Sequence, residues 1–169
     1  MKDNTVLTPH FALREFTESA TAMKHGIDNR PTPEVVENLR RLCTHTLEPL
    51  REKLGLPIII TSGFRTKELN DIIVHASRKS QHMEGRAADF YVAQGPVQGS
   101  RVQVSRELLI QAFRLIITEP EIDFDQLIIY PTFIHVSYVS KEKNRHRLTR
   151  ASSNGAYTAL SRADALSLA

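Results

Sequence analysis

The sequence lacks cysteine pairs and long apolar runs. Its single cysteine, Cys43, cannot form an internal disulfide, and a zinc ribbon or a redox pair would need partner cysteines. The longest apolar runs, at 56–60 and 127–130, reach about five residues, whereas a membrane-spanning helix needs roughly twenty. We therefore expect no membrane span, and any metal site must use His, Asp and Glu side chains.

Internal repeats and low-complexity segments are also lacking, and no secretion signal is visible in the printed sequence. The N-terminal segment MKDNTVLTPHF holds one lysine and no apolar stretch of the kind found in a signal peptide. The chain has 169 residues, of which 41% are hydrophobic and 24% charged, and this composition fits one domain with a sizeable core. We expect a single domain over residues 1–150 and a C-terminal tail over 151–169, in a protein that is cytoplasmic as synthesised.

A large charge of one sign is missing as well, but the small positive charge is unevenly distributed. The net charge is +3, from 22 Lys and Arg against 19 Asp and Glu. Residues 139–169 hold six basic residues against two acidic ones, so the rest of the chain carries a charge of −1. The basic stretch KEKNRHRLTR at 141–150 is predicted to be a solvated surface, because no nucleic-acid-binding motif accompanies it. We therefore expect no nucleic-acid partner.

The pattern of apolar residues predicts an α+β fold with a small, mainly antiparallel sheet flanked by helices. Helices are predicted over 33–54, with a bend at Pro49, over 69–74, and from a cap at Ser105 through 117. Strands are predicted at 57–61, 86–92, 126–130 and 133–138, and a short break joins the last two as a hairpin.

Three residues in these segments have the chemistry of a metal site. His82 and Asp89 flank a turn and enter the strand at 86–92, and His135 is placed on a neighbouring strand. Two imidazoles and a carboxylate can occupy three corners of a tetrahedron around zinc and leave the fourth corner open, as in catalytic zinc sites. The same residues also fit a simpler interpretation, in which His82 and Asp89 form a hydrogen-bonded pair and His135 is a half-buried strand residue.

Five motifs in this order resemble the zinc D-Ala-D-Ala carboxypeptidase and L-Ala-D-Glu endopeptidase family, whose metal site is shared with the hedgehog signalling domain. They are SGFRT at 62–66, Asn70, S-x-H-x-x-G-x-A-x-D at 80–89, FDQLI at 124–128 and FIHVS at 133–137, and the similarity runs from about residue 11 to 148. The resemblance implies a zinc peptidase-like domain with Zn²⁺ bound by His82, Asp89 and His135.

The resemblance also assigns two polar residues to the cleft. Arg65 in SGFRT matches an arginine that stabilises the anionic intermediate or the substrate carbonyl, a role for which a guanidinium is well suited. Its alternative is a structural ion pair with Asp71 or Glu68. Ser80 matches a residue that hydrogen-bonds substrate or a ligand, and its alternative is a loop cap.

The sequence departs from the family at the general base. Relatives place a Glu or Asp about three or six residues before the last histidine, whereas this chain has Thr132 and Ile129 there and no carboxylate anywhere in 126–134. Glu84 and Asp125 are the two acidic residues that could replace it. Each has a simpler interpretation, Glu84 as an exposed loop acid and Asp125 as a residue that fixes a loop through backbone N–H groups.

The resemblance implies a zinc metallopeptidase that hydrolyses peptide bonds in peptidoglycan stem peptides, as a carboxypeptidase or an endopeptidase. The loops at 75–80 and 93–104 are expected to decide between these two activities. The missing base favours an alternative, a catalytically impaired relative that keeps the metal site and binds cell-wall peptides or another protein. Action at the cell wall or periplasm implies a bacterial protein or one related to a phage or prophage.

Overall fold

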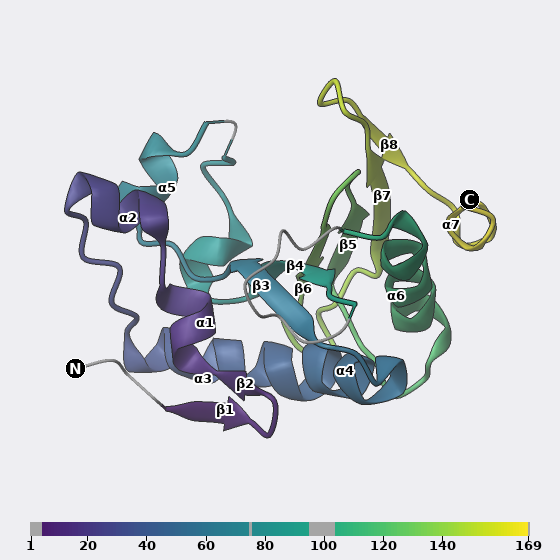
Figure 1. The fold of residues 1–169 in the computed structure, drawn as a ribbon, viewed down its shortest axis with the longest axis horizontal. Coiled ribbons are helices and arrows are strands. Elements are labelled where there is room, and N and C mark those ends of the chain that lie inside the picture. The colour runs from purple at the N-terminus through teal and green to yellow at the C-terminus, as the bar shows by residue number, and fades with distance from the viewer. Residues whose placement is uncertain (1–4, 75, 95–103, 169) are drawn as a thin grey trace.

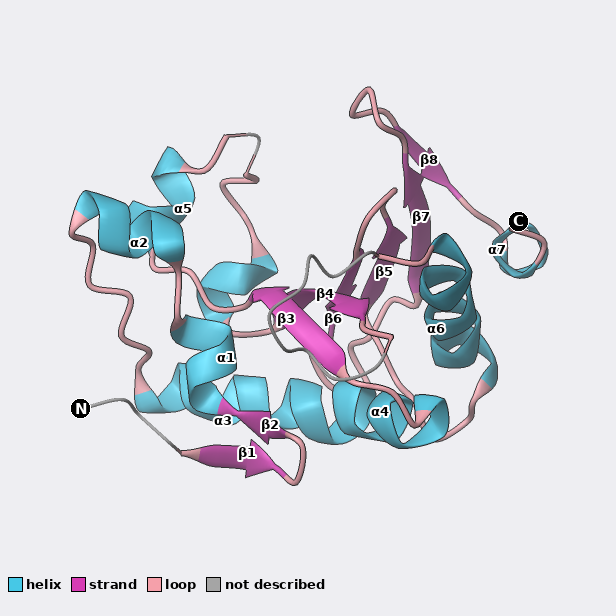
Figure 2. Ribbon diagram, viewed as in Figure 1, coloured by secondary structure: helices cyan, strands magenta, loops and turns pink. Residues whose placement is uncertain are grey.

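The computed structural model describes residues 5–74, 76–94 and 104–168, and within them a large sheet is combined with helices (Figures 1 and 2). The strands of this sheet are β3 (Ile58–Ser62), β4 (Ala87–Val92), β5 (Gln126–Ile129), β6 (Ile134–Ser137), β7 (Arg147–Ala151) and β8 (Tyr157–Ala159). A separate small hairpin is formed by β1 (Val6–Thr8) and β2 (Phe11–Ala12). The α-helices are α1 (Leu13–Thr17), α2 (Ala20–His25), α3 (Pro33–Leu42), α4 (Glu48–Leu54), α5 (Lys67–Ile72), α6 (Arg106–Thr118) and α7 (Arg162–Leu166).

The large sheet has the strand order β3-β4-β6-β5-β7-β8. Its neighbouring strands are antiparallel except for β5 and β7, which run parallel. The α+β class and the mainly antiparallel sheet are confirmed, but the sheet is larger than the small one predicted from sequence. The difference comes from β7 and β8, which lie in the basic stretch and in the C-terminal segment.

The long helix predicted over residues 33–54 is interrupted at its centre by one wide turn. Residues Cys43–Leu47 form a π-helical turn between α3 and α4, and Pro49 occupies the first turn of α4. Proline has no N–H group, so it cannot donate a helical hydrogen bond to the carbonyl of His45. The backbone N–H of Asp123 donates to that carbonyl instead, at 3.0 Å. The predicted bend is therefore a π-turn that also fixes the segment leading into β5.

One face of the sheet packs on α6, which contacts β4 and β5 and also packs against α4 (Figure 1). Alternate residues of the central strands enter this core, and Phe90, Leu127 and Val136 are fully buried together with Phe113 of α6. Because side chains alternate along a strand, Asp89 and His135 lie on the opposite face. None of the helices in the described part of the chain is both long enough and apolar enough to span a membrane.

The C-terminal segment adds to the sheet and to the core. β8 pairs antiparallel with β7, with Ala151 opposite Tyr157. The short helix α7 packs against α6, where Ala165 and Leu168 are buried and Arg114 donates a hydrogen bond to the carbonyl of Leu168. Residues 151–168 thus cover the end of the sheet, while the division of the chain into a domain and a tail at residue 150 stays a prediction.

Candidate metal centre

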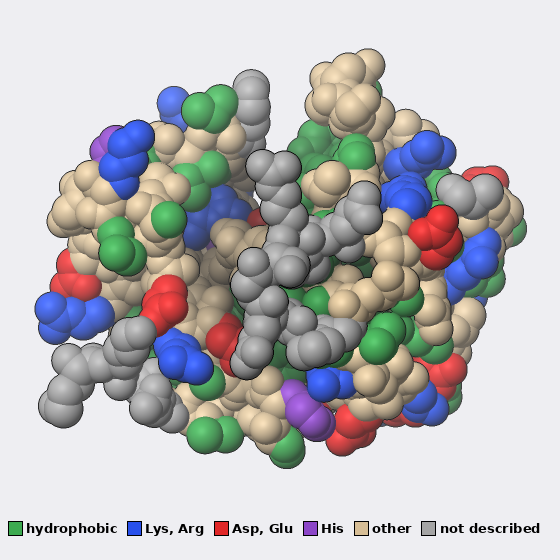
Figure 3. All heavy atoms as spheres, in the orientation of Figure 1, with side chains coloured by type: hydrophobic (Ala, Val, Ile, Leu, Met, Phe, Trp, Pro, Cys, Tyr) green, Lys and Arg blue, Asp and Glu red, His purple; other side chains and the backbone are tan. Residues whose placement is uncertain are grey.

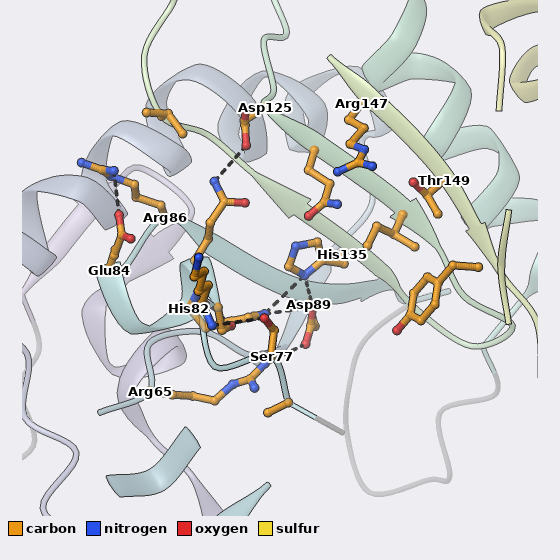
Figure 4. Close-up of a pocket in the computed structure, with 18 of the residues that line it drawn as sticks. Arg65, Ser77, His82, Glu84, Arg86, Asp89, Asp125, His135, Arg147 and Thr149 are labelled. Carbon is orange, nitrogen blue, oxygen red and sulfur yellow. Dashed lines mark hydrogen bonds and ion pairs between the residues drawn. The ribbon is translucent and has the colours of Figure 1, made fainter. Parts of the chain in front are cut away.

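Three side chains from separate parts of the chain converge on one point of the sheet (Figure 4). Asp89 of β4 lies directly opposite His135 of β6 in the antiparallel register. His82 comes from a short 3-10 helix, Gln81–Glu84, that precedes β4. The Oδ1 atom of Asp89 lies 2.8 Å from Nδ1 of His135 and 3.3 Å from Nε2 of His82, and the two histidine nitrogens are 3.3 Å apart. The side chains that the sequence motif singled out are therefore brought together.

The orientation of His82 is fixed by a backbone carbonyl. Its Nδ1 lies 2.7 Å from the oxygen of Gly63, and since a carbonyl can only accept, Nδ1 carries the proton and donates. Burial lowers the pKa of His82, so the imidazole is held in its neutral form. The unprotonated Nε2 then faces Asp89 and His135, as a metal-binding histidine requires.

Gly63 can hold this carbonyl in place because it has no side chain. A Cβ atom at this position would lie 2.5 Å from the backbone of Phe16, closer than atoms can approach without a shift. The next residue, Phe64, donates its N–H to the carbonyl of Phe16 at 2.7 Å. The packing of α1 against the end of β3 therefore supports the orientation of His82, which the sequence did not reveal.

The three atoms meet the requirements of a zinc site. Zinc is bound by imidazole nitrogen and carboxylate oxygen at about 2.0–2.2 Å, and two ligands at such distances in a tetrahedron lie about 3.3 Å from each other. Two of the three separations measured between His82, Asp89 and His135 equal this value, and all candidate atoms lie within 4.8 Å of one another. Two nitrogens and one oxygen also form a donor set that zinc prefers.

Arg65 lies beside this cluster and is almost fully buried, with 9% of its surface exposed. Its Nη2 atom is 3.5 Å from Oδ2 of Asp89, and Nε donates to Ser62 at 3.2 Å. Nη1 lies 3.4 Å from the side-chain oxygen of Asn70, the residue that formed a motif of its own. The alternative partner Asp71 forms an ion pair with Lys67 instead. A guanidinium is thus held at the edge of the cluster.

The pKa of Asp89 reflects the same neighbours. Burial raises the pKa of this carboxyl, but His82 and His135 outweigh the effect and hold the pKa well below its usual range. Asp89 is therefore ionised. Its Oδ1 atom contacts the two histidines, and its Oδ2 atom contacts Arg65.

The remaining predicted residues lie around the cluster without contacting its three atoms. The hydroxyl of Ser80 caps the 3-10 helix by accepting from the N–H of His82 at 3.4 Å, and Ser80 also lines the pocket. Glu84 is exposed and forms an ion pair with Arg86 at 2.6 Å (Figure 4). The carboxylates of Glu84 and Asp125, the two candidate bases, thus both have partners outside the cluster. Glu84 is paired with Arg86, and Asp125 accepts hydrogen bonds from Gln81 and Arg145.

Asp125 is 1% exposed and is bound from several sides. Its Oδ1 accepts from the backbone N–H of Arg145 at 2.9 Å and from Nε of Arg145 at 2.8 Å, and its Oδ2 accepts from Gln81 at 2.8 Å. Burial raises the pKa of Asp125, but the hydrogen bonds from Arg145 and Gln81 outweigh it and lower the pKa below its ordinary value. This geometry matches the interpretation of Asp125 as a residue that fixes a loop.

Replacing Asp125 with Asn is expected to lower the free energy of unfolding by about 2–3 kcal/mol at neutral pH, because hydrogen bonds to a buried charge are lost. The pKa of Asp125 is lower in the folded protein than in the unfolded chain. Its carboxylate therefore contributes fully to the free energy of unfolding above about pH 4, and this contribution is lost as the pH falls through the pKa of the folded state. Urea unfolding at pH 7 and pH 3 measures both effects. Asp71→Asn, which removes an exposed carboxylate paired with Lys67, is the control. An Asp125→Asn protein as stable as this control would contradict the structural role.

The cluster lies in a pocket of about 840 Å³. The molecule is hollowed between the part that carries α2 and α5 and the part that carries β7 and β8 (Figure 3). Residues 76, 77, 79 and 80 of the loop after α5 line one side. Residue 75 and most of the second loop expected to shape the site, residues 95–103, lie outside the described residues.

Two tyrosines of this pocket were not predicted from sequence. The hydroxyls of Tyr130, at the end of β5, and Tyr157, in β8, are 3.0 Å apart, and the Tyr130 ring stacks on Phe133. Burial and the hydrogen bond to Tyr157 raise the pKa of Tyr130 above its ordinary value. Because the ordinary pKa of tyrosine, about 10, already lies above neutrality, Tyr130 is a neutral hydroxyl group and not a general base at physiological pH.

The basic residues of the stretch 141–150 are exposed, as a solvated surface requires. Three of them, Lys143, Arg145 and Arg147, also line the pocket, because β7 pairs with β5 beside the strand that carries His135. Their place at the pocket was not predicted from sequence.

Comparison with known protein families supports the resemblance inferred from the motifs. The family model for peptidase M15 matches residues 9–115, which is more than half of the chain and includes Arg65, Ser80, His82 and Asp89. A comparison with curated proteins gives no match. The chain therefore belongs to the peptidase M15 family, the zinc-dependent metallopeptidases of the D-Ala-D-Ala carboxypeptidase type.

Proposed function

We propose that this chain is a zinc peptidase that hydrolyses peptide bonds in peptidoglycan stem peptides, with His82, Asp89 and His135 as the zinc ligands. The observation that carries the proposal is the convergence of Nε2, Oδ1 and Nδ1 of these residues at separations of 2.8–3.3 Å. When bound, zinc supplies a Lewis acid that polarises the scissile carbonyl and lowers the pKa of a coordinated water.

In this proposal Arg65 stabilises the negative charge that develops on the carbonyl oxygen during hydrolysis. Its guanidinium is fixed by Ser62, Asn70 and Asp89, so it does not need to reorganise as the charge forms. Ser80 is placed at the pocket wall, where its hydroxyl orients the 3-10 helix and contacts the peptide.

A proton must also pass from the attacking water to the leaving amine. Asp125 is poorly suited to this role because it is buried and bound by Arg145 and Gln81. Glu84 is exposed and held by one ion pair, whose release costs at most about 1 kcal/mol at a solvated site. We therefore assign the proton transfer to Glu84, after its side chain leaves Arg86 and turns toward the cluster.

Glu84→Gln is expected to lower kcat by about 10²- to 10⁴-fold, the usual contribution of a general acid–base group, while the zinc content stays unchanged. Arg86→Gln is the matched control, because it breaks the same ion pair and keeps the carboxylate. Steady-state hydrolysis of purified muropeptides measures the effect. A Glu84→Gln protein as active as Arg86→Gln would exclude Glu84 from the reaction.

The second candidate function is a metal-containing binding module without peptidase activity. It is favoured by the pairing of the acidic residues that line the pocket in the described part of the chain, since Glu84, Asp89 and Asp125 each form an ion pair with an arginine. Zinc-loaded protein incubated with muropeptides, with mass spectrometry of the products, separates the two functions. Release of zinc-dependent products supports the peptidase and identifies the bond that is cut. Full zinc occupancy with no product, together with retained muropeptide binding, supports the binding module.

A further inference from the structure

The pocket face of the sheet extends beyond the proposed zinc ligands onto β5 and β7. His135 lies opposite Ile128 of β5, and Ile128 lies opposite Thr149 of β7. In the adjacent row of the same two strands, Gln126 lies opposite Arg147. All of these residues line the pocket, so the floor reaches two strands away from His135.

Arg147 and Thr149 project from β7 on the side of the sheet that carries His135 (Figure 4). The residue between them, Leu148, is buried in the core on the opposite face. This alternation fixes the direction of Arg147, because a strand cannot turn one side chain to the other face without turning its neighbours.

The charges that line the pocket do not cancel. Six lining residues are basic and three are acidic. Each acidic side chain is paired with one arginine, and the pairs are Glu84 with Arg86, Asp89 with Arg65, and Asp125 with Arg145. The other three basic side chains, Lys79, Lys143 and Arg147, form no ion pair or side-chain hydrogen bond with the residues that the structure describes. The uncompensated charge of the pocket is therefore positive.

We propose that Arg147 forms a subsite for a carboxylate of the peptide substrate, two strands away from His135. The inference rests on the proposed peptidase function and names the feature of the substrate that the pocket selects. The planar guanidinium can bind a carboxylate through two parallel hydrogen bonds, and Lys79 and Lys143 add positive charge at the rim.

The spacing of the sheet indicates where this carboxylate lies in the substrate. Adjacent strands are about 4.8 Å apart, so β7 lies about 10 Å from β6, and an extended peptide advances about 3.3 Å per residue. Arg147 lies two residues along β7 from Thr149, which is in the same row as His135, so the path from His135 to Arg147 is oblique and about 12 Å long. A peptide with its scissile bond at His135 that follows this path places its third or fourth residue at Arg147. The subsite thus recognises an acidic group about three to four residues from the bond that is cut.

The test compares two stem pentapeptides, one with free side-chain carboxylates and one in which these carboxylates are amides. Wild-type protein is expected to hydrolyse the acidic peptide with the higher kcat/KM. Arg147→Gln is expected to lower this acid-over-amide ratio about tenfold, through a higher KM for the acidic peptide. Added salt raises the KM of the wild type for the acidic peptide and has less effect on Arg147→Gln, because the interaction is between charges in a solvated pocket.

Arg150→Gln is the matched control. Arg150 is also exposed on β7 and carries the same charge, but it does not line the pocket. Its acid-over-amide ratio is expected to equal that of the wild type. The subsite is overturned if Arg147→Gln retains the wild-type ratio, or if Arg150→Gln lowers it equally.

A binding measurement separates failure of the subsite from failure of the peptidase function. If the zinc-loaded wild type hydrolyses neither peptide, the peptidase proposal fails, and equilibrium binding of the two uncleaved peptides still tests Arg147. Tighter binding of the acidic peptide that is lost in Arg147→Gln supports the subsite. Equal binding of both peptides overturns it. Competition by poly(glycerol phosphate) that depends on Arg147, without any preference for the acidic peptide, also overturns it.

Discussion

Replacing His82 with alanine is expected to remove both the bound zinc and the peptidase activity. His82 is 2% exposed, and its Nε2 lies 3.3 Å from both Oδ1 of Asp89 and Nδ1 of His135, so it supplies one of the three ligand atoms of the cluster. Loss of the metal removes several kcal/mol of transition-state stabilisation, which corresponds to a fall in kcat of at least about 10³-fold.

Zinc retained after dialysis and products formed from muropeptides measure the two effects of His82→Ala. His25→Ala is the control, because His25 lies on the exposed end of α2 and does not line the pocket. This control should keep one zinc per chain and the wild-type rate. A His82→Ala protein that keeps stoichiometric zinc and full activity would show that the reaction takes place elsewhere.

Replacing Arg65 with Gln should have the second largest effect, a loss of about 10²- to 10³-fold in kcat. All three proposed ligand atoms belong to other residues, so the zinc content is expected to stay unchanged. KM should change little, because the guanidinium acts on charge that forms only in the transition state. Arg65→Lys keeps the charge but loses the planar fork, and an intermediate kcat is expected.

Arg162→Gln, which removes an exposed arginine at the start of α7, is the control for general effects of charge. A separate determination of kcat, KM and zinc content decides the role of Arg65. If Arg65→Gln loses zinc together with activity, Arg65 positions Asp89 and does not act on the substrate directly.

The convergence of His82, Asp89 and His135 could be predicted from the sequence because two kinds of local information agree. The alternation of polar and apolar residues fixes which face each strand presents, and the motif spacing places Asp89 and His135 on strands that prove to be neighbours. Some helix ends were also predictable, since Thr32 and Ser105 cap α3 and α6 and Gly55 ends α4 in a left-handed conformation. The short helix predicted over 69–74 instead spans Lys67–Ile72, because Thr66 caps its start and Ile73 is extended.

The strands β7 and β8 were not predictable for a physical reason. The sequence of β7, RLTRA, contains one large apolar residue, Leu148, and its charged neighbours resemble a solvated loop. Its strand conformation depends on the parallel pairing with β5, in which Leu127 lies opposite Leu148. Such long-range pairing overrides local preference, and it is also what brings Arg147 into the pocket.

The contacts of the two candidate bases, Glu84 and Asp125, could be predicted from the sequence only in part. The absence of an acidic residue in 126–134 is visible in the sequence, and so are Glu84 and Asp125 as the nearest replacements. Their partners Arg86 and Arg145 are not visible, because an ion pair depends on side-chain direction and not on spacing alone. Likewise, the closeness of Gly63 to Phe16 depends on how α1 packs against β3.

The central claim is that His82, Asp89 and His135 bind one zinc ion together. The most direct test is a crystal structure of the zinc-loaded protein, with anomalous diffraction measured at the zinc absorption edge. One strong anomalous peak is expected at about 2.0–2.2 Å from Nε2 of His82, Oδ1 of Asp89 and Nδ1 of His135. No peak between these three atoms in the presence of excess zinc, or a zinc ion bound only at other residues, would contradict it.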